Sequence, residues 1–322
     1  MAFEDELGSD ISQSGSEDYT LGATGIVTKT ISLWTRNIVR YLAIVGFIAA
    51  ACVITSYAIL VLMFDTVGTL GADPLAFVVN LFFFTAEPTL LIVSLGFAIF
   101  AFVLNAILYG AAIKFTLDEY GGTGGDVGAS FSHSISRVLN FIIVQLVLTF
   151  VAAIAIIPAS AYTFQAMEAI GPIEFIDPLN PVFPSEAMEM LMVAMVLFVV
   201  GGIFIIYFNT RFAPTLAIVI DTDLSAIDSF KKSWELTSGN FFHVFGSFIL
   251  MNIVVFIFSI IVSGVAYFTG VPTYDQLVIG SVVTAFLFSA LTYIFQSVLY
   301  RDLSSRNQGS SVSSSLDNLR VI

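Results

Sequence analysis

A series of long apolar runs separated by polar stretches dominates the pattern of this sequence. An α-helix needs about twenty mostly apolar residues to cross roughly 30 Å of hydrocarbon. Six runs reach that length and contain neither Lys nor Arg: Tyr41–Phe64, Thr89–Ile113, Val138–Tyr162, Ala187–Phe208, Phe241–Phe268 and Leu277–Tyr300. The pattern therefore predicts an all-α, polytopic membrane protein with six transmembrane helices.

Two apolar stretches need closer definition. The fourth run contains Glu189 near its start. A charge at the bilayer centre costs about 2.5–3.5 kcal/mol, so we expect this helix to begin near Met190. A further apolar piece, Leu75–Thr85, lies between Pro74 and Pro88 and is too short to cross a bilayer. We expect it to form a re-entrant or surface helix.

The composition excludes several classes of protein. Of the 322 residues, 57% are hydrophobic and 11% are charged, against roughly 45–50% and about 25% in soluble domains. A soluble enzyme is therefore excluded. The 24 acidic and 11 basic residues give a net charge of −13, so nucleic acid is not an expected partner. Cys52 is the single cysteine, which excludes an internal disulfide and a cysteine-based metal cluster.

All Lys and Arg residues fall on one side of the predicted bundle. Cytoplasmic loops collect these residues, whereas translocated loops avoid them. The bases form four groups on the same side: Lys29, Arg36 and Arg40; Lys114 and Arg137; Arg211, Lys231 and Lys232; and Arg301, Arg306 and Arg320. We therefore expect a multi-pass protein of the cell membrane with both termini in the cytoplasm. Its expected parts are an acidic disordered arm (1–28), the six-helix transmembrane domain (29–301) and a Ser-rich cytoplasmic tail (302–322).

A faint repeat runs through the six spans. Asn37, Asn140 and Asn240 precede the first, third and fifth spans, at separations of 103 and 100 residues. Each Asn follows an amphipathic stretch whose apolar residues lie three or four positions apart, on one helical face. These observations predict three pseudo-repeats, each an interfacial helix plus a helical hairpin, around a pseudo-threefold axis.

The third amphipathic stretch has the clearest helix signals. Ser225 with Asp228 matches a capping box, and Gly239 matches a helix stop. Trp and basic side chains favour the lipid headgroup layer. The candidate lipid-interface residues are Trp34, Lys231, Lys232 and Trp234. An equally supported alternative is that this third stretch is a connector packed against the bundle.

Two neighbouring segments carry a family resemblance: Arg211–Asp221 (RFAPTLAIVID) and Ser225–Asn240 (SAIDSFKKSWELTSGN). They resemble uncharacterised, largely archaeal, six-helix membrane proteins related to the membrane domain of glycerophosphoryl diester phosphodiesterase. The resemblance implies the six-helix fold. Enzymes of that group carry their chemistry in a separate soluble domain, and we expect none of that size here. Phosphodiesterase activity is therefore not expected.

Four neutral amides lie within the predicted spans: Asn105, Gln145, Asn252 and Gln296. They are candidate intramembrane polar residues, because polar side chains within membrane spans often line the path of a transported solute or ion. Neutral amides also bond neighbouring helices, at about 0.6 kcal/mol each. We favour the structural role, because transport sites more usually contain a charged residue or paired broken helices.

No catalytic, metal or cofactor site can be assembled from the sequence. His133 and His243 lack the i, i+4 spacing of a zinc-binding pair, so we expect interfacial polar roles. The run Gly121–Gly125 lacks the Lys–Ser/Thr ending of a phosphate loop and predicts a turn. An enzyme acting on lipid headgroups would need one of the two histidines near phosphate.

By elimination, these features predict a non-catalytic membrane-organising or accessory subunit. Its expected partners are membrane lipids and other membrane proteins. The alternative is a small-solute permease with a path between the helices, lined by the four amides. The surplus of acidic side chains favours a halophilic archaeal source, because high salt screens their repulsion.

Overall fold

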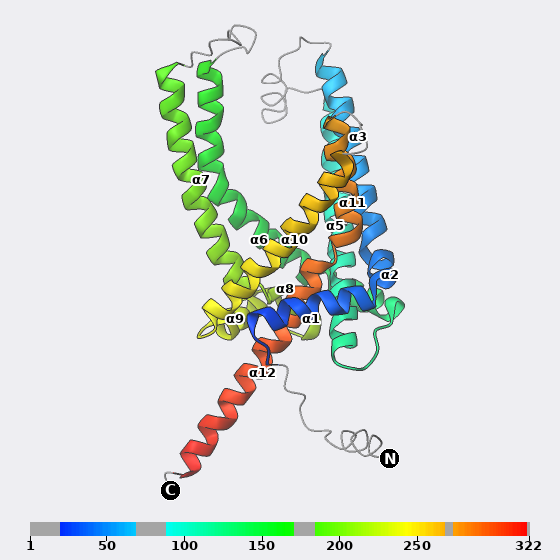
Figure 1. Cartoon of the computed structure of the whole chain (residues 1–322), viewed down its shortest axis with the longest axis vertical. Coiled ribbons are helices and arrows are strands. Elements are labelled where there is room, and N and C mark those ends of the chain that lie inside the picture. The colour runs from blue at the N-terminus through cyan, green and yellow to red at the C-terminus, as the bar shows by residue number, and fades with distance from the viewer. Residues whose placement is uncertain (1–19, 69–87, 171–183, 268–272, 321–322) are drawn as a thin grey trace.

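The computed structural model describes residues 20–68, 88–170, 184–267 and 273–320, which are helical apart from short turns and contain no strand. In chain order the elements are α1 (Ala23–Arg36), α2 (Ile38–Tyr41), the π-helical segment η1 (Leu42–Gly46), α3 (Phe47–Gly68), α5 (Pro88–Tyr120), α6 (Val127–Ile170), α7 (Ser185–Phe212), α8 (Thr215–Asp221), α9 (Ala226–Thr237), α10 (Phe241–Tyr267), α11 (Thr273–Phe288) and α12 (Leu291–Arg320). Figure 1 shows their arrangement.

Six helical stretches are long and apolar enough to cross a membrane: Ile38–Ile59, Ile92–Tyr120, Val127–Ile170, Ser185–Asp221, Phe241–Val265 and Val278–Gln308. Each contains most of one of the six predicted spans. The prediction of an all-α fold with six spans is confirmed, and the chain is a multi-pass membrane protein.

The fourth span begins earlier than predicted. Helix α7 starts at Ser185, so the expected start near Met190 is wrong, and Glu186 and Glu189 lie in the first two turns. Acidic side chains there complement the positive end of the helix dipole, so they favour an earlier helix start. The predicted short helix Leu75–Thr85 lies outside the described residues.

The sixth predicted span is not one continuous helix. Helix α11 ends at Phe288 and α12 begins at Leu291. A helix end leaves carbonyl groups without intrahelical partners. The indole N–H of Trp34 donates a hydrogen bond to one of them, the Leu287 carbonyl, at 3.1 Å. The break is therefore stabilised from α1.

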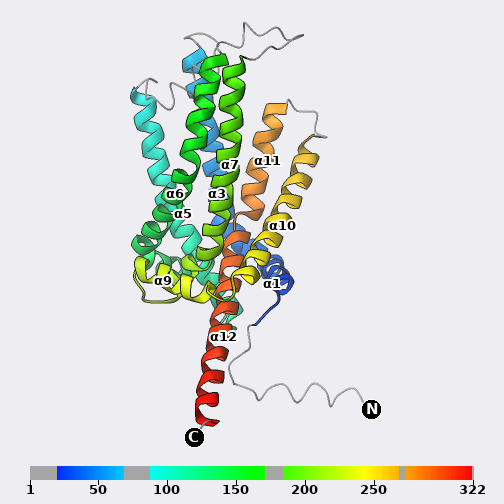
Figure 2. The same cartoon turned by 90° about the vertical axis from the view of Figure 1, so that its left-hand side faces the viewer.

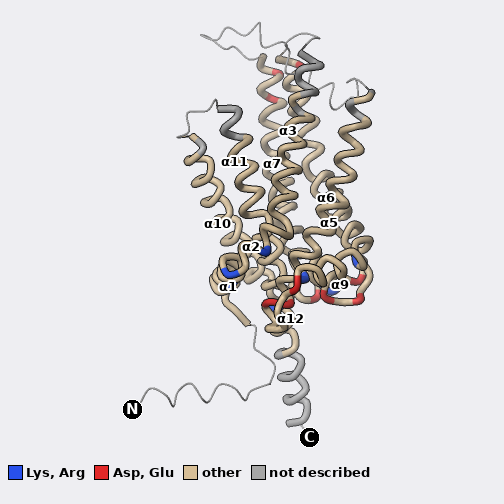
Figure 3. Tube along the Cα trace, turned by 90° about the vertical axis from the view of Figure 1, so that its right-hand side faces the viewer, with Lys and Arg blue, Asp and Glu red and all other residues tan. Residues whose placement is uncertain are grey.

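The buried core lies at one end of the bundle. Figure 3 shows Lys and Arg, within the described part of the chain, gathered at the end that carries α1, α9 and the start of α12. We call this the basic end. Most core side chains, from α1, α5, α8, α10 and α12, belong to the same end. Farther away, the helices expose many large apolar side chains, as expected for surfaces that face lipid.

The centre of the basic end is α8, a helix of two turns. All its residues from Thr215 to Ile220 are buried, and it packs among α5, α6, α9 and α12. Pro214 separates α8 from α7, because proline removes a backbone N–H and favours the start of a helix. The basic end is thus organised around a short helix that spans nothing itself.

The long helices diverge from the basic end. In Figure 1 the far end of the α6–α7 hairpin stands apart from the far ends of α3, α5, α10 and α11, and Figure 2 shows the same helices from the side. Helix α6 packs on α7 and on α5, and α3 packs on α11. The α5–α6 contact includes a hydrogen bond from the Ser134 hydroxyl to the Ile107 carbonyl at 2.7 Å. The arms are therefore connected mainly through the basic end.

Two of the three predicted repeat units begin with a separate helix, α1 or α9. After each, an Asn side-chain amide donates to the carbonyl four residues earlier: Asn37 to Leu33 and Asn240 to Leu236, both at 3.4 Å. In the second unit α6 runs through Asn140 without a break. The residues immediately before Asn140 include no helix-breaking Gly or Pro.

Several local predictions for α9 are confirmed. The Ser225 hydroxyl accepts a bond from the Asp228 N–H at 3.2 Å and donates to its carboxylate at 2.7 Å. Gly239, just beyond the helix, has a φ of +83°, which favours glycine. Helix α1 starts within the predicted arm 1–28, and burial continues past residue 301 to Leu303.

Candidate functional site

A buried carboxylate at the end of α5 joins three parts of the basic end. The Glu119 side chain is 6% exposed and lies 3.3 Å from Arg36 Nη2 and 3.1 Å from Arg40 Nη1. The Gly125 N–H also donates to Glu119, at 2.9 Å. Two glycines of the run 121–125 have φ of +73° and +76°, which confirms the predicted turn. The turn binds a carboxylate of its own chain.

A second buried carboxylate, Asp302 on α12, joins α10 and the segment before α1. Asp302 is fully buried. It accepts bonds from the Leu21 N–H at 2.6 Å and from Arg306 Nε at 3.0 Å, and it lies 2.8 Å from His243 Nε2. This cluster ties three chain segments together.

Most other bases of the basic end are also paired: Lys114–Asp118, Arg137–Asp223, Lys231–Asp228, Lys232–Glu235 and Arg301–Asp221. Lys231 and Lys232, the predicted contacts for lipid phosphate, bond carboxylates of their own helix at 3.0 and 3.4 Å. The pKa of Asp228 lies below its ordinary value, chiefly because the Ser225 hydroxyl bonds its carboxylate and secondly because Lys231 does so. Each lysine therefore has a carboxylate of its own helix beside it, in an exposed ion pair.

Arg211, near the end of α7, is different. Within the described chain, no carboxylate lies within ion-pair distance of it. Its guanidinium carbon lies over three aromatic rings instead, 4.6 Å from the centroid of Trp234, 5.0 Å from Phe241 and 5.8 Å from Tyr207. We call these three rings the aromatic box. They come from α7, α9 and α10, so three helices meet at one cation.

Hydrogen bonds fix the backbone of Arg211 but leave part of its side chain unpaired. The hydroxyls of Ser233 and Thr237 donate to the Arg211 carbonyl at 2.9 and 3.2 Å. The guanidinium Nε and Nη1 are buried and have no hydrogen-bond partner in the described structure. Nη2 is not among these enclosed nitrogens, so its N–H groups are the donors that an anion could reach.

The two tryptophans predicted to lie at the lipid interface have different surroundings. Trp34 is half-buried against the stacked rings of Phe258 and Phe288, at centroid distances of 6.5 and 5.6 Å. Trp234 is 45% exposed and forms one wall of the aromatic box. Trp34 therefore packs against the bundle, whereas Trp234 keeps an exposed face.

The two histidines do not meet. His133 Nε2 lies 2.8 Å from the carbonyl oxygen of Ile220 on α8, and His243 belongs to the Asp302 cluster. Within the described ranges, no group of three or more His, Cys, Asp or Glu side chains is placed to hold a metal ion. Each histidine instead joins two helices.

Comparison with protein families identifies a family for this chain. The family "Domain of unknown function (DUF7847)" matches residues 127–303, more than half of the chain. The chain belongs to the DUF7847 family. Neither the comparison with curated proteins nor that with solved structures found a match.

The limits of the DUF7847 match correspond to features of the fold. The match begins with the first residue of α6 and ends at Leu303, the last core residue of α12. It contains Arg211 with its aromatic box, the buried helix α8, and both His243 and Asp302. Helices α1, α3 and α5 lie outside the match. The box is therefore built entirely from the DUF7847 domain.

The four intramembrane amides fall into two groups. Asn252, in the DUF7847 domain, lies on an exposed face of α10, and its amide donates to the Phe248 carbonyl of the same helix at 2.8 Å. Asn105, Gln145 and Gln296 are half-buried, and their side-chain carbonyl oxygens lack partners in the described structure. The four residues therefore do not share one internal path.

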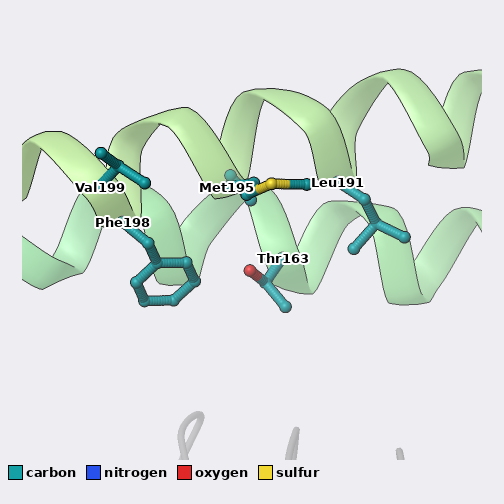
Figure 4. A pocket seen from close by; sticks show the side chains of 6 residues that line it. Thr163, Leu191, Met195, Phe198 and Val199 are labelled. Carbon is teal, nitrogen blue, oxygen red and sulfur yellow. The ribbon is translucent and has the colours of Figure 1, made fainter.

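An apolar hollow lies on the α6–α7 hairpin of the DUF7847 domain. Figure 4 shows Leu191, Met195, Phe198 and Val199 of α7 around it, with Thr163 of α6. Its volume is about 430 Å³. The Thr163 hydroxyl donates to the carbonyl of Ala159 at 2.9 Å, so the lining offers little to a polar solute. A hollow of this kind suits a hydrocarbon chain.

Proposed function

We propose that this DUF7847 protein is a non-catalytic membrane-organising or accessory subunit that contacts lipid with its basic end. One observation carries the proposal. Of the ten Lys and Arg whose side chains are described, eight form ion pairs with carboxylates of the same chain. Four of these eight bases bond a carboxylate of a different segment and so fix segments relative to one another: Arg36, Arg40, Arg137 and Arg301. The other four bond a carboxylate of their own helix.

The lipid partner is supported by exposed aromatic side chains at the basic end. Trp234 is 45% exposed and Phe242 is 84% exposed. Aromatic rings of this kind favour the headgroup layer. Other membrane proteins remain part of the proposal as partners, because the diverging arms present long apolar faces.

A permease is the second candidate. The unpartnered side-chain oxygens of Asn105, Gln145 and Gln296 favour it, because buried polar atoms ordinarily have hydrogen-bond partners. The exposed position of Asn252 and the apolar lining of the α6–α7 hollow argue against a continuous polar path.

The proposal includes an orientation and a setting. With the basic end at the cytoplasmic face of the cell membrane, both described chain ends would lie in the cytoplasm. The excess of acidic residues supports an archaeal, high-salt setting, and the sequence resemblance supports kinship with the phosphodiesterase membrane domain. These finer assignments rest on the sequence alone.

A flux assay separates the two candidates. The full chain is reconstituted in phospholipid vesicles, and the uptake of glycerol and of small amino acids is followed. We expect no uptake above that of empty vesicles, and native mass spectrometry of the extracted protein should show bound lipid. The test variant replaces Asn105, Gln145 and Gln296 with Leu, and Asn252→Leu is the matched control. Uptake by the wild type that the triple variant loses, with an unchanged unfolding temperature, would establish the permease instead.

A further inference from the structure

We infer that Arg211 and its aromatic box bind the phosphate of a phospholipid headgroup at the basic end. The site deepens the proposed function and rests on it for the presence of lipid. The sequence placed this contact at Lys231 and Lys232, whose charges are paired within α9. Lys29 and Arg211 are the two described bases without an ion pair, and of these two Arg211 has buried nitrogens that lack a hydrogen-bond partner.

The charge of Arg211 is only partly compensated. Its side chain is half-buried, with Nε and Nη1 enclosed. A desolvated cation without an anion is unfavourable, and contacts with ring faces offset only part of that cost. A phosphate oxygen bonded at Nη2 would neutralise the whole group, because guanidinium charge is delocalised over its three nitrogens.

The surroundings of the box suit a lipid better than a free ion. Tyr207 is 41% exposed and Phe204, one turn before it, is 46% exposed. Phe204 stacks on Phe208 at a centroid distance of 6.2 Å. These rings form an apolar surface on α7 leading away from Arg211. Acyl chains attached to the phosphate would cover that surface, whereas inorganic phosphate would leave it bare.

The same geometry has a purely structural alternative. Arg211 already contacts rings from α7, α9 and α10, so it would hold these helices together with no ligand. The two roles differ in one respect. A structural Arg211 affects the unfolding temperature alone, whereas a phosphate-binding Arg211 also determines which lipids the protein retains.

Native mass spectrometry of the full chain in detergent tests the site. Phosphatidylglycerol is titrated against wild type, Arg211→Gln and Lys231→Gln, the latter removing one positive charge from a paired base nearby. We expect Arg211→Gln to weaken phosphatidylglycerol binding about tenfold or more, the loss typical of a charge-assisted hydrogen bond. Lys231→Gln should bind as the wild type does. Binding of a galactolipid, which has no phosphate, should be equal in all three proteins.

Three results would overturn the inference. Equal phosphatidylglycerol binding by Arg211→Gln and wild type would leave Arg211 a structural role only. Displacement of the lipid by millimolar inorganic phosphate would show that the site takes the free ion. In a Trp34→Phe background, Trp234 is the single tryptophan, and brominated phosphatidylglycerol bound at the box should quench its fluorescence. If the fluorescence stays the same as in lipid-free protein, the box is excluded as the site. This result would hold even if Arg211→Gln failed to fold. Solute flux would refute the proposed function without affecting these measurements.

Discussion

Adjacent glycines in the middle of α7 provide a sharp test of how the α6–α7 hairpin packs. A Cβ at Gly201 would come closer than 3.0 Å to the carbonyl oxygen of Ala155 on α6. A Cβ at Gly202 would meet no atom within 4 Å. We therefore compare Gly201→Ala with Gly202→Ala.

The difference between the two variants isolates the steric cost. Both positions lie in a helix interior, where Gly→Ala gains about 0.5–1 kcal/mol from backbone entropy, and this gain cancels in the comparison. Overpacking costs about 1–3 kcal/mol. The clashing atom at Gly201 belongs to the backbone and cannot rotate away. We therefore expect Gly201→Ala to be less stable than Gly202→Ala by about 2–3 kcal/mol, the upper part of that range.

Equilibrium unfolding in mixed micelles, followed by tryptophan fluorescence, measures this difference. The Gly202→Ala variant should unfold at or slightly above the wild-type midpoint, and Gly201→Ala well below it. Coincident midpoints for the two variants would refute the close α6–α7 approach at Gly201. A loss of stability confined to Gly202→Ala would reverse the assignment of the contact face.

Three further predictions concern the basic end and its orientation. Asp302→Asn should destabilise the protein by about 3 kcal/mol in the same unfolding assay, because it breaks a buried charged cluster; an unchanged midpoint would contradict that role. Ser225→Ala should raise the pKa of Asp228 toward its ordinary value in an NMR titration. Because this pKa is lowered, ionised Asp228 stabilises α9 at pH values above the ordinary pKa of the group. The stabilisation is lost as the pH falls through the lowered pKa. This pH-dependent loss of stability should be smaller in Ser225→Ala. A Ser311→Cys variant in a Cys52→Ser background should resist impermeant thiol reagents in intact cells, and labelling would reverse the proposed orientation.

The long spans and the third amphipathic helix could be predicted because their signals are local. Runs of twenty apolar residues have few alternatives to a membrane helix, and all six predicted runs correspond to candidate spans. In α9 the cap at Ser225 and the stop at Gly239 each depend on residues within a few positions. The expected interfacial helix in the second unit could not be separated from its span, since α6 continues through Asn140.

Features that depend on distant partners could not be predicted in the same way. The burial of α8 comes from four other helices, and no periodicity within seven residues encodes it. The break before Leu291 requires Trp34 to reach the Leu287 carbonyl, and these residues are far apart in the sequence. Hydropathy predicted an interfacial position for Trp34, because the sequence around a tryptophan at a span boundary does not indicate which distant residues it packs against.

The candidate site illustrates the same limit for charges. The sequence shows how many basic residues the chain has, but not which carboxylate pairs with each of them. Lys231 and Lys232 were favoured as lipid contacts because they stand beside Trp234, yet their own helix supplies the partners. From the sequence, Arg211 was used as one of the bases that predict which side of the membrane is cytoplasmic. The available signal was that Arg211 and Trp234 both belong to the two segments that carry the family resemblance.

The location of the core at the basic end has a physical cause. In lipid, apolar helices gain no hydrophobic free energy by associating, so close packing there relies on small residues such as Gly201 and on hydrogen bonds. At the basic end, the short helices α1, α8 and α9 supply additional apolar faces, and the carboxylates of Glu119 and Asp302 bind donors from several segments. The arms are thus fixed mainly from one end. A lipid phosphate at Arg211, where α7, α9 and α10 meet, would act on the position of the α6–α7 arm, while changes at the far ends of the arms would leave the basic end intact.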